Sequence, residues 1–136
     1  HTLAVDDNGV LYAWGCGDSG RTGLSQQPAS RTLLSPVLPL CISAGLPVSR
    51  VSCGDSHTAA IVGEAGSATA ELWTWGRGES YRLGHGSKED ERRPRRVEDL
   101  DEKRVVDVSC GSSHTVVVCV EGDVYAWGQN DSGQCG

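Results

Sequence analysis

Three histidines at nearly equal spacing are the residues whose types and positions could do chemistry. His57 and His114 each end a Cys-Gly-x-x-His pattern, which begins at Cys53 and at Cys110, and His1 lies 56 residues before His57. Thiolate and imidazole groups bind zinc, so each pattern resembles one half of a tetrahedral site. Because each pair belongs to a separate copy of a repeat and supplies only two ligands, we expect no metal. Each ring is instead expected to fix the glycine turn before it through hydrogen bonds.

Catalytic and cofactor-binding arrangements are not expected either. His-Thr pairs recur in every copy, whereas a nucleophilic constellation should occur once. The Gly-x-Gly patterns that begin at Gly15 and Gly76 are not followed by a predicted helix, so they do not suit a nucleotide phosphate. We therefore predict no catalytic residue and no cofactor, and a chain that is not an enzyme.

A repeat of about 57 residues positions these histidines. Residues 1–23 align without a gap on residues 114–136, with twelve identities. The middle copy fits the same frame once five extra residues within 63–70 are allowed, and residues 48–54 align on residues 105–111. Each unit therefore includes a strand before its histidine and is about four strands long.

Short apolar runs between turn residues predict β-strands. Residues 2–5 and 10–14 are joined through Asn8-Gly9, a step typical of a tight hairpin turn. In the second run, Tyr12 and Trp14 share one face and are expected to provide most of the burial. Further strands are predicted at residues 33–40, 48–53, 57–62, 72–75, 94–100 and within 104–127, so the fold class is all-β.

The chain resembles the regulator of chromosome condensation repeat family at residues 52–58, 72–76 and 124–136. These segments read SCGDSHT, LWTWG and VYAWGQNDSGQCG, and they follow the family's glycine-x-x-histidine-threonine, tyrosine-x-tryptophan-glycine and glycine-rich patterns. Kelch and WD blades fit less well, because the chain contains neither Gly-Gly nor Trp-Asp. The departures from the family pattern concern loop detail rather than the fold, and they are Thr22, Trp73, Tyr81 and Cys135.

The resemblance implies part of a seven-bladed β-propeller built from four-stranded antiparallel blades. Residues 1–47 are expected to form a partial first blade and its connection, residues 48–104 a complete middle blade, and residues 105–136 a partial third blade. Recurring positions are expected to be structural, with tryptophans that pack between blades rather than stack on a ligand. These positions are His1, Trp14, Gly54, His57, Trp75, Gly76, Gly111, His114, Trp127 and Gly128.

An acidic residue followed by serine recurs in the loop after each Trp-Gly pair. Because antiparallel strands alternate in direction, these loops and the turn before His57 should emerge on one face. Asp and Ser are also ordinary turn residues, but the functional interpretation is an acidic rim for a partner that presents lysine or arginine. The candidate partner-binding residues are Asp18, Asp55, Arg77, Glu79, Tyr81 and Asp131.

Charge and composition argue against several classes of partner. The formal net charge of −6 disfavours nucleic acid. Residues 88–104 contain seven basic and seven acidic side chains, which suits a solvated connection with local ion pairs better than a basic patch. No run of eighteen apolar residues predicts a membrane span.

The six cysteines are predicted to be free thiols. Cys53 and Cys110 repeat in register, and Cys119 lies in an apolar run where a thiol serves as a small hydrophobic group. This usage favours a reducing intracellular compartment, either nuclear or cytoplasmic.

These features together predict a binding role. The chain begins and ends within repeats, so we expect a piece of a longer protein, and we expect its isolated sheet edges to promote self-association. The favoured function is a protein-interaction module or scaffold. The alternative implied by the resemblance is a guanine-nucleotide exchange factor for a Ran-type small GTPase, with chromatin association. This alternative would need a basic face and a protruding wedge, and the sequence shows neither.

Overall fold

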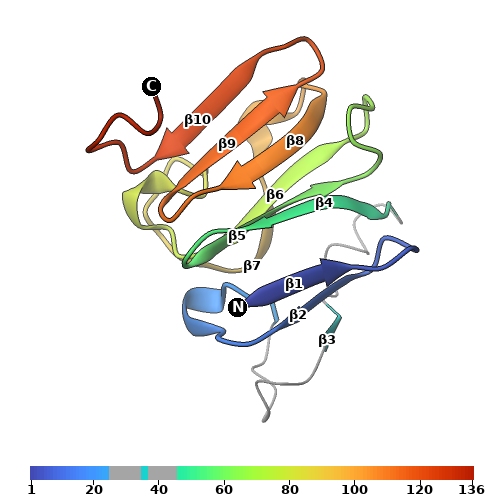
Figure 1. Ribbon diagram of the computed structural model, residues 1–136, viewed down its shortest axis with the longest axis horizontal. Coiled ribbons are helices and arrows are strands. Elements are labelled where there is room, and N and C mark those ends of the chain that lie inside the picture. The colour runs from blue at the N-terminus through green and yellow to red at the C-terminus, as the bar shows by residue number, and fades with distance from the viewer. Residues whose placement is uncertain (25–34, 37–45) are drawn as a thin grey trace.

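Three antiparallel β-sheets are stacked side by side in the computed structural model, which describes residues 1–24, 35–36 and 46–136 (Figure 1). The first sheet has the order β1-β2-β3, the second β4-β5-β6-β7 and the third β8-β9-β10. The strands are β1 Thr2–Val5, β2 Leu11–Trp14, β3 Ser35–Pro36, β4 Val48–Cys53, β5 His57–Val62, β6 Glu71–Gly76, β7 Glu91–Arg96, β8 Val105–Cys110, β9 His114–Cys119 and β10 Val124–Gly128.

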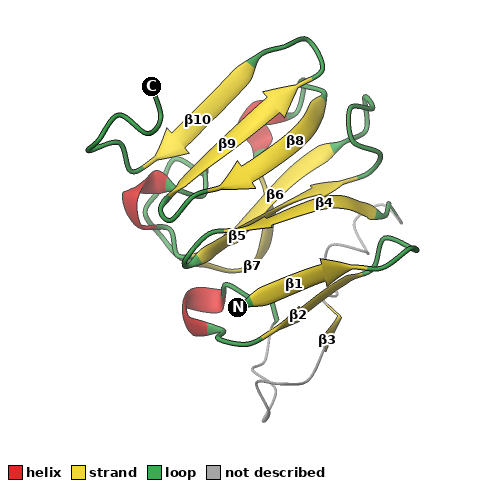
Figure 2. Ribbon diagram, viewed as in Figure 1, coloured by secondary structure: helices red, strands yellow, loops and turns green. Residues whose placement is uncertain are grey.

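Only three short 3₁₀ turns interrupt the strands in the described part of the chain, as Figure 2 shows: η1 Asp18–Gly20, η2 Glu79–Tyr81 and η3 Glu98–Leu100. The all-β prediction is therefore confirmed. Of the strand predicted at residues 33–40, β3 is described and the remainder lies outside the described residues. No helix among the described residues is long and apolar enough to cross a membrane.

The hairpin between β1 and β2 turns at the predicted Asn-Gly step. The Asp6 carbonyl accepts from the Gly9 amide at 2.9 Å, and Asp6 Oδ1 accepts from the amides of Asn8 and Val10 at 2.9 and 2.8 Å. Gly9 has a φ of 76°, a left-handed conformation that costs glycine little because it has no Cβ. The turn thus holds the two strands in antiparallel register.

The hydrophobic core lies between neighbouring sheets. One cluster joins the first and second sheets, and a second cluster joins β5 and β6 to β8 and β9. Leu11 and Ala13 are fully buried in the first cluster against Trp75, whereas Tyr12 and Trp14 are only partly buried. The prediction that the two aromatic residues dominate the burial of β2 is therefore wrong, because the face of β2 that meets the second sheet carries the aliphatic residues.

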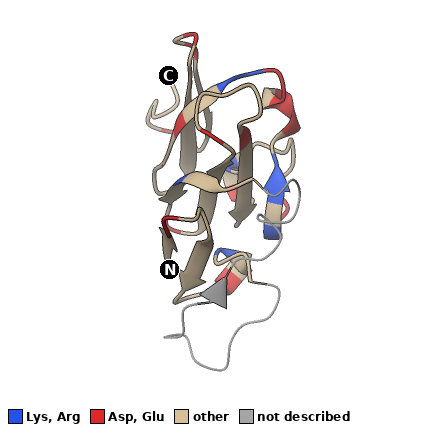
Figure 3. Cartoon of the chain, turned by 90° about the vertical axis from the view of Figure 1, so that its right-hand side faces the viewer, with Lys and Arg blue, Asp and Glu red and all other residues tan. Residues whose placement is uncertain are grey.

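The charged run at residues 88–104 forms β7 and η3 on the outer side of the second sheet. Arg96 pairs with Glu71 at 2.8 Å and with Asp101 at 2.9 Å. Figure 3 shows acidic and basic segments interspersed along this part of the chain. The predicted local ion pairs are present, but the run forms a strand and a 3₁₀ turn rather than a simple connection. Each exposed pair contributes about 0–1 kcal/mol.

The enlarged hairpin loop at residues 63–70 packs against the third sheet. The Gly66 amide donates to the Val105 carbonyl at 2.7 Å, and a side chain added at Gly66 would meet Val120 Cγ2 at 3.0 Å. Ala65 packs against the core between the second and third sheets. Part of this insertion therefore connects two sheets rather than forming a free loop.

Candidate functional site

One edge of the three sheets gathers the loops in which the candidate residues lie. This loop edge, formed by residues 15–23, 54–56, 76–86, 111–113 and 128–136, lies on the left in Figure 1. The hairpin turns after β1, β5 and β9 lie at the opposite edge, because adjacent antiparallel strands alternate in direction. The loop edge carries Asp18, Asp55, Arg77, Glu79, Tyr81 and Asp131.

The recurring histidines connect neighbouring sheets. His57 Nε2 lies 3.0 Å from Thr115 Oγ1 of the third sheet, and His1 Nε2 lies 2.8 Å from Thr58 Oγ1 of the second. Each hydroxyl donates its single proton to a main-chain carbonyl, at 2.8 Å for Thr115 and 2.7 Å for Thr58. The hydroxyls must therefore accept from the rings, so Nε2 carries the proton in each histidine.

These ring hydrogen bonds differ from the prediction that each histidine would bond the glycine turn before it. The main chain closes that turn, since the Gly54 amide donates to the His57 carbonyl at 2.9 Å. The ring instead covers the glycine, because a Cβ on Gly54 would lie 2.4 Å from His57 Cε1. Burial, helped by the Arg82 guanidinium, lowers the pKa of His57 to about 4, so the ring is neutral at pH 7.

The Arg82 main-chain carbonyl joins the second and third sheets. It accepts from Thr115 Oγ1 at 2.8 Å and from Trp127 Nε1 at 3.0 Å. Trp75, which has the same repeat position as Trp127, is fully buried between the first and second sheets. These contacts support a packing role for the recurring tryptophans.

Asp55 connects loops of all three sheets. Its Oδ2 accepts from Ser112 Oγ of the third sheet at 2.6 Å. Its carbonyl accepts from Arg21 Nη1, which follows the first sheet, at 3.0 Å. One residue of the second sheet thus holds the loops on either side of it in place.

Arg77 and Glu79 form an exposed ion pair on the same edge. Glu79 also approaches Arg82, whose Nε donates to the Glu79 carbonyl at 2.7 Å. Burial and the Arg77 charge lower the pKa of Arg82, while the carboxylates of Glu79 and Asp55 act in the opposite direction. The structure therefore brings Asp55, Arg77 and Glu79 together around one buried guanidinium.

Asp18 and Asp131 make local contacts within their own loops. The Asp18 carbonyl accepts from Arg21 Nε at 2.9 Å, and Asp131 Oδ2 accepts from Gln129 Nε2 at 2.7 Å. Among the described residues, neither carboxylate bonds to Asp55, Arg77 or Glu79. These two candidates share the edge but not the cluster.

The sequence had predicted an acidic loop edge, but the structure shows that the edge is mixed in charge. Arg21, Arg77 and Arg82 lie among its carboxylates. Arg21 and Arg82 were missed as candidate residues. Each arginine comes three residues after the acidic residue of the acid-serine pair in its loop. This shared repeat position is the signal that could have identified them.

No group of three or more metal-ligating side chains occurs among the described residues. The described cysteines, Cys16, Cys53, Cys110, Cys119 and Cys135, are free thiols. Burial raises the pKa of Cys110 to about 12, which keeps this thiol protonated and makes it a poor nucleophile at neutral pH. Cys119 is buried in the core as predicted.

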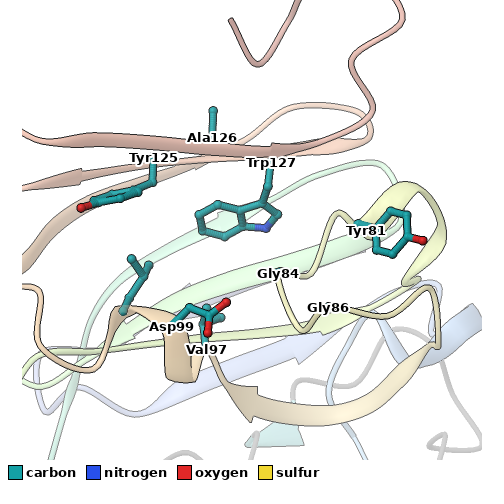
Figure 4. A pocket seen from close by; sticks show the side chains of 9 residues that line it. Tyr81, Gly84, Gly86, Val97, Asp99, Tyr125, Ala126 and Trp127 are labelled. Carbon is teal, nitrogen blue, oxygen red and sulfur yellow. The ribbon is translucent and has the colours of Figure 1, made fainter.

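A groove of about 380 Å³ opens between η2, η3 and β10 (Figure 4). Tyr81, Tyr125 and Trp127 line it, and Asp99 faces it from η3. Only Tyr81 had been predicted as a binding residue. Tyr125 and Trp127 occupy recurring positions of the repeat.

Stacked antiparallel sheets with four strands in the complete unit, joined by short loops at one edge, define a segment of a β-propeller. The family model of the Regulator of chromosome condensation (RCC1) repeat matches residues 8–61 and 70–118. A second model of the same repeat matches residues 105–134. The chain belongs to the Regulator of chromosome condensation (RCC1) repeat family.

Similar proteins are much longer than this chain. It is 42% identical over 141 residues to the E3 ubiquitin-protein ligase HERC2 of Homo sapiens, with all of the chain and 3% of HERC2 covered. It is 35% identical over 137 residues to the Ultraviolet-B receptor UVR8 of Arabidopsis thaliana, with all of the chain and 29% of UVR8 covered.

Solved structures show the same fold. Prp20p from Saccharomyces cerevisiae superposes with a TM-score of 0.79 at 20% identity, over 98% of this chain and 31% of Prp20p. The chain thus spans less than a third of each of these three proteins.

Proposed function

We propose that this chain is a protein-interaction module that presents its loop edge to a partner protein inside the cell, in the nucleus or the cytoplasm. The main observation behind the proposal is the position of Asp55, whose hydrogen bonds connect loops of three sheets in one surface. Loops held in this way lose little conformational entropy on binding, so they suit recognition.

The chemistry of the edge favours a partner with charges of both signs. The side chains of Arg77 and Glu79 are 49% and 57% exposed, so both can exchange their mutual ion pair for contacts with a partner. Asp18, Tyr81 and Asp131 are proposed to extend this contact area along the edge. The similar proteins are named for unlike activities, a ligase and a receptor, which fits a scaffold whose binding surface is adapted in each.

Affinity capture with matched variants tests this proposal. The wild-type chain and an Arg77→Glu/Glu79→Arg variant would be used as baits, and each captured protein would be purified and its affinity measured by calorimetry. A partner of the loop edge should bind the variant about tenfold or more weakly, since interface charge reversals cost several kcal/mol. Asp7→Lys, at the opposite hairpin edge, is the control. If the control weakens binding equally, or the loop-edge variant binds normally, the proposal fails.

Guanine-nucleotide exchange on a Ran-type small GTPase, with chromatin association, is the second candidate. It is favoured by the shared fold of Prp20p, a protein described with its binding properties to Gsp1p and histones. The release of labelled GDP from a Ran-type GTPase, measured with and without this chain and with longer forms of the protein, tests it. Accelerated release would place this candidate first.

A further inference from the structure

A buried arginine on the loop edge has hydrogen-bond donors without acceptors. Arg82 is only 5% exposed, and its Nε donates to the Glu79 carbonyl at 2.7 Å. Within the described part of the chain, neither Nη1 nor Nη2 makes a hydrogen bond, and Oε2 of Glu79 lies 3.9 Å from Nη2, too far to accept one. Buried polar groups are as a rule hydrogen-bonded, so the free donors of Arg82 suggest an acceptor from outside the chain.

The equivalent arginine of the first loop shows what Arg82 lacks. Arg21 has the same repeat position, and its Nε donates to the Asp18 carbonyl at 2.9 Å. Its Nη1 also donates to the carbonyl of Asp55 in the next sheet, at 3.0 Å. The counterpart of Asp55 in the third sheet is Ser112, whose carbonyl accepts nothing from Arg82 in the described structure. Arg82 therefore lacks the second acceptor that the repeat gives to Arg21.

An outer strand does not explain this difference. β7 packs against η1 beside Arg21, yet both acceptors of Arg21 are main-chain carbonyls at the loop edge rather than groups of β7. Asp18, the counterpart of Glu79, is exposed although β7 lies beside its turn. The free donors of Arg82 and the exposure of Glu79 thus belong to the loop edge itself.

A second guanidinium lies on the other side of the Glu79 carboxylate. Arg77 Nη2 is 2.5 Å from Glu79 Oε2, and the two side chains are 49% and 57% exposed. Burial and the charge of Arg77 lower the pKa of Arg82, as expected for two cations that share too little negative charge. Glu79 reaches Arg77 but not Arg82, because its own main chain is held in η2.

The surroundings of this arginine pair, Arg77 and Arg82, favour a carboxylate over a phosphate. Asp55 and Asp90 act on the charge of Arg82, but Asp55 Oδ2 accepts from Ser112 Oγ at 2.6 Å and Asp90 Oδ1 from the Gly78 amide at 2.9 Å. A monoanion that replaces the Glu79 carboxylate keeps the local charge unchanged. A phosphate dianion would add negative charge beside two fixed carboxylates. A planar carboxylate also matches the fork of a guanidinium group.

We propose that the arginine pair binds an aspartate or glutamate side chain of a partner protein, which displaces the carboxylate of Glu79. The incoming carboxylate accepts from the free Nη groups of Arg82 and from Arg77, while Glu79 turns into solvent. Because it is not attached to η2, this carboxylate can approach Arg82 more closely than Glu79 does. The inference deepens the proposed function and rests on it for the identity of the ligand as a protein.

A peptide titration tests the arginine pair directly. The probes are acetyl-Gly-Gly-Glu-Gly-Gly-amide and the same peptide with glutamine or phosphoserine in place of glutamate. Binding to the whole chain would be followed by NMR through the Nε–H signal of Arg82. We expect a saturable shift with a dissociation constant on the order of 1–10 mM for the glutamate peptide, as one side chain allows. The glutamine peptide should bind at least about fivefold more weakly, and the phosphoserine peptide no more tightly than glutamate.

Two variants give opposite expectations, and a third is the control. Glu79→Gln keeps the size of the side chain and removes the competing carboxylate, so it should strengthen glutamate binding about threefold to tenfold. Arg77→Gln should weaken binding by a similar factor, and its exposed position makes a folding defect an unsuitable explanation. Asp7→Asn removes the same charge as Glu79→Gln at the opposite hairpin edge and should leave binding unchanged.

Several results would overturn the proposal. Equal binding of the glutamine peptide, weaker binding in Glu79→Gln, or the absence of a shift at Arg82 would each contradict a carboxylate site. Tighter binding of the phosphoserine peptide would mean that the pair is a phosphate site instead. A partner captured through the loop edge without a peptide shift would refute this inference alone, whereas a peptide shift without any loop-edge partner would refute the proposed function alone.

Discussion

Replacing Thr115 by valine tests the contact between histidine and threonine that joins neighbouring sheets. Thr115 is fully buried, and its hydroxyl accepts from His57 Nε2 at 3.0 Å while it donates to the Arg82 carbonyl at 2.8 Å. Valine keeps the size and the β-branched shape of threonine. The substitution therefore removes both hydrogen bonds with little change in packing.

The two lost bonds are unequal in cost. The Arg82 carbonyl keeps the hydrogen bond from Trp127 Nε1 at 3.0 Å. Losing its second hydrogen bond, from Thr115, should therefore cost less than about 1 kcal/mol. The buried His57 ring has no partner for Nδ1 among the described residues, and the substitution would also remove its partner at Nε2. Leaving that donor unsatisfied costs about 1–3 kcal/mol, so Thr115→Val should lower the free energy of unfolding by about 1–4 kcal/mol.

Urea denaturation at neutral pH, followed by tryptophan fluorescence, measures this loss. Thr2→Val is the matched control, because Thr2 has the same repeat position in β1 but is exposed and has no side-chain hydrogen bond among the described residues. The control should stay within about 0.5 kcal/mol of the wild type. An unchanged midpoint in Thr115→Val, or an equal loss in both variants, would refute the reasoning.

Three further predictions follow from the same contacts. The pKa of His57 is about 4 in the folded chain against 6.5 in the unfolded one, so the folded state binds fewer protons, and roughly 3 kcal/mol of stability should be lost as the pH falls from 6.5 towards 4. His57→Gln should flatten that profile in urea titrations, and an unaltered slope would count against it. Gly84→Ala should melt below Gly86→Ala, since both have positive φ but only Gly84 lies against Trp127; equal melting temperatures would show no such clash. The isolated chain should self-associate in sedimentation, and Val124→Lys, at a residue 62% exposed on the edge strand β10, should reduce this; a monomer at every concentration would contradict the prediction.

The strands could be predicted because the repeat supplies the same signals several times. Residues 48–53 and 57–62 were predicted as strands and form β4 and β5 with those bounds. The turn at Gly9 was also predictable, since an Asn-Gly step strongly favours one backbone geometry. Short-range sequence signals are therefore enough to predict these features.

Contacts between sheets could not be predicted in the same way. The sequence shows that His57 recurs but not that its ring reaches Thr115, because the partner lies 58 residues away in the next sheet. The face of β2 that is buried was predicted wrongly for the same reason. An alternating strand has two faces, and only the position of the neighbouring sheet decides that Leu11 and Ala13 lie in the core.

Differences between the copies need not disturb the contacts that join neighbouring sheets, and Tyr81 shows why. Its counterpart Gly20 lies against β7 of the neighbouring sheet, where a Cβ would be 2.3 Å from Arg92 Cα. Tyr81 has the same left-handed conformation, with a φ of 61°, and its side chain is 50% exposed. The hydrogen bonds from Thr115 and Trp127 to Arg82, the next residue, are still present. A repeat can thus change one loop residue while the neighbouring residue keeps the contacts that hold the sheets together.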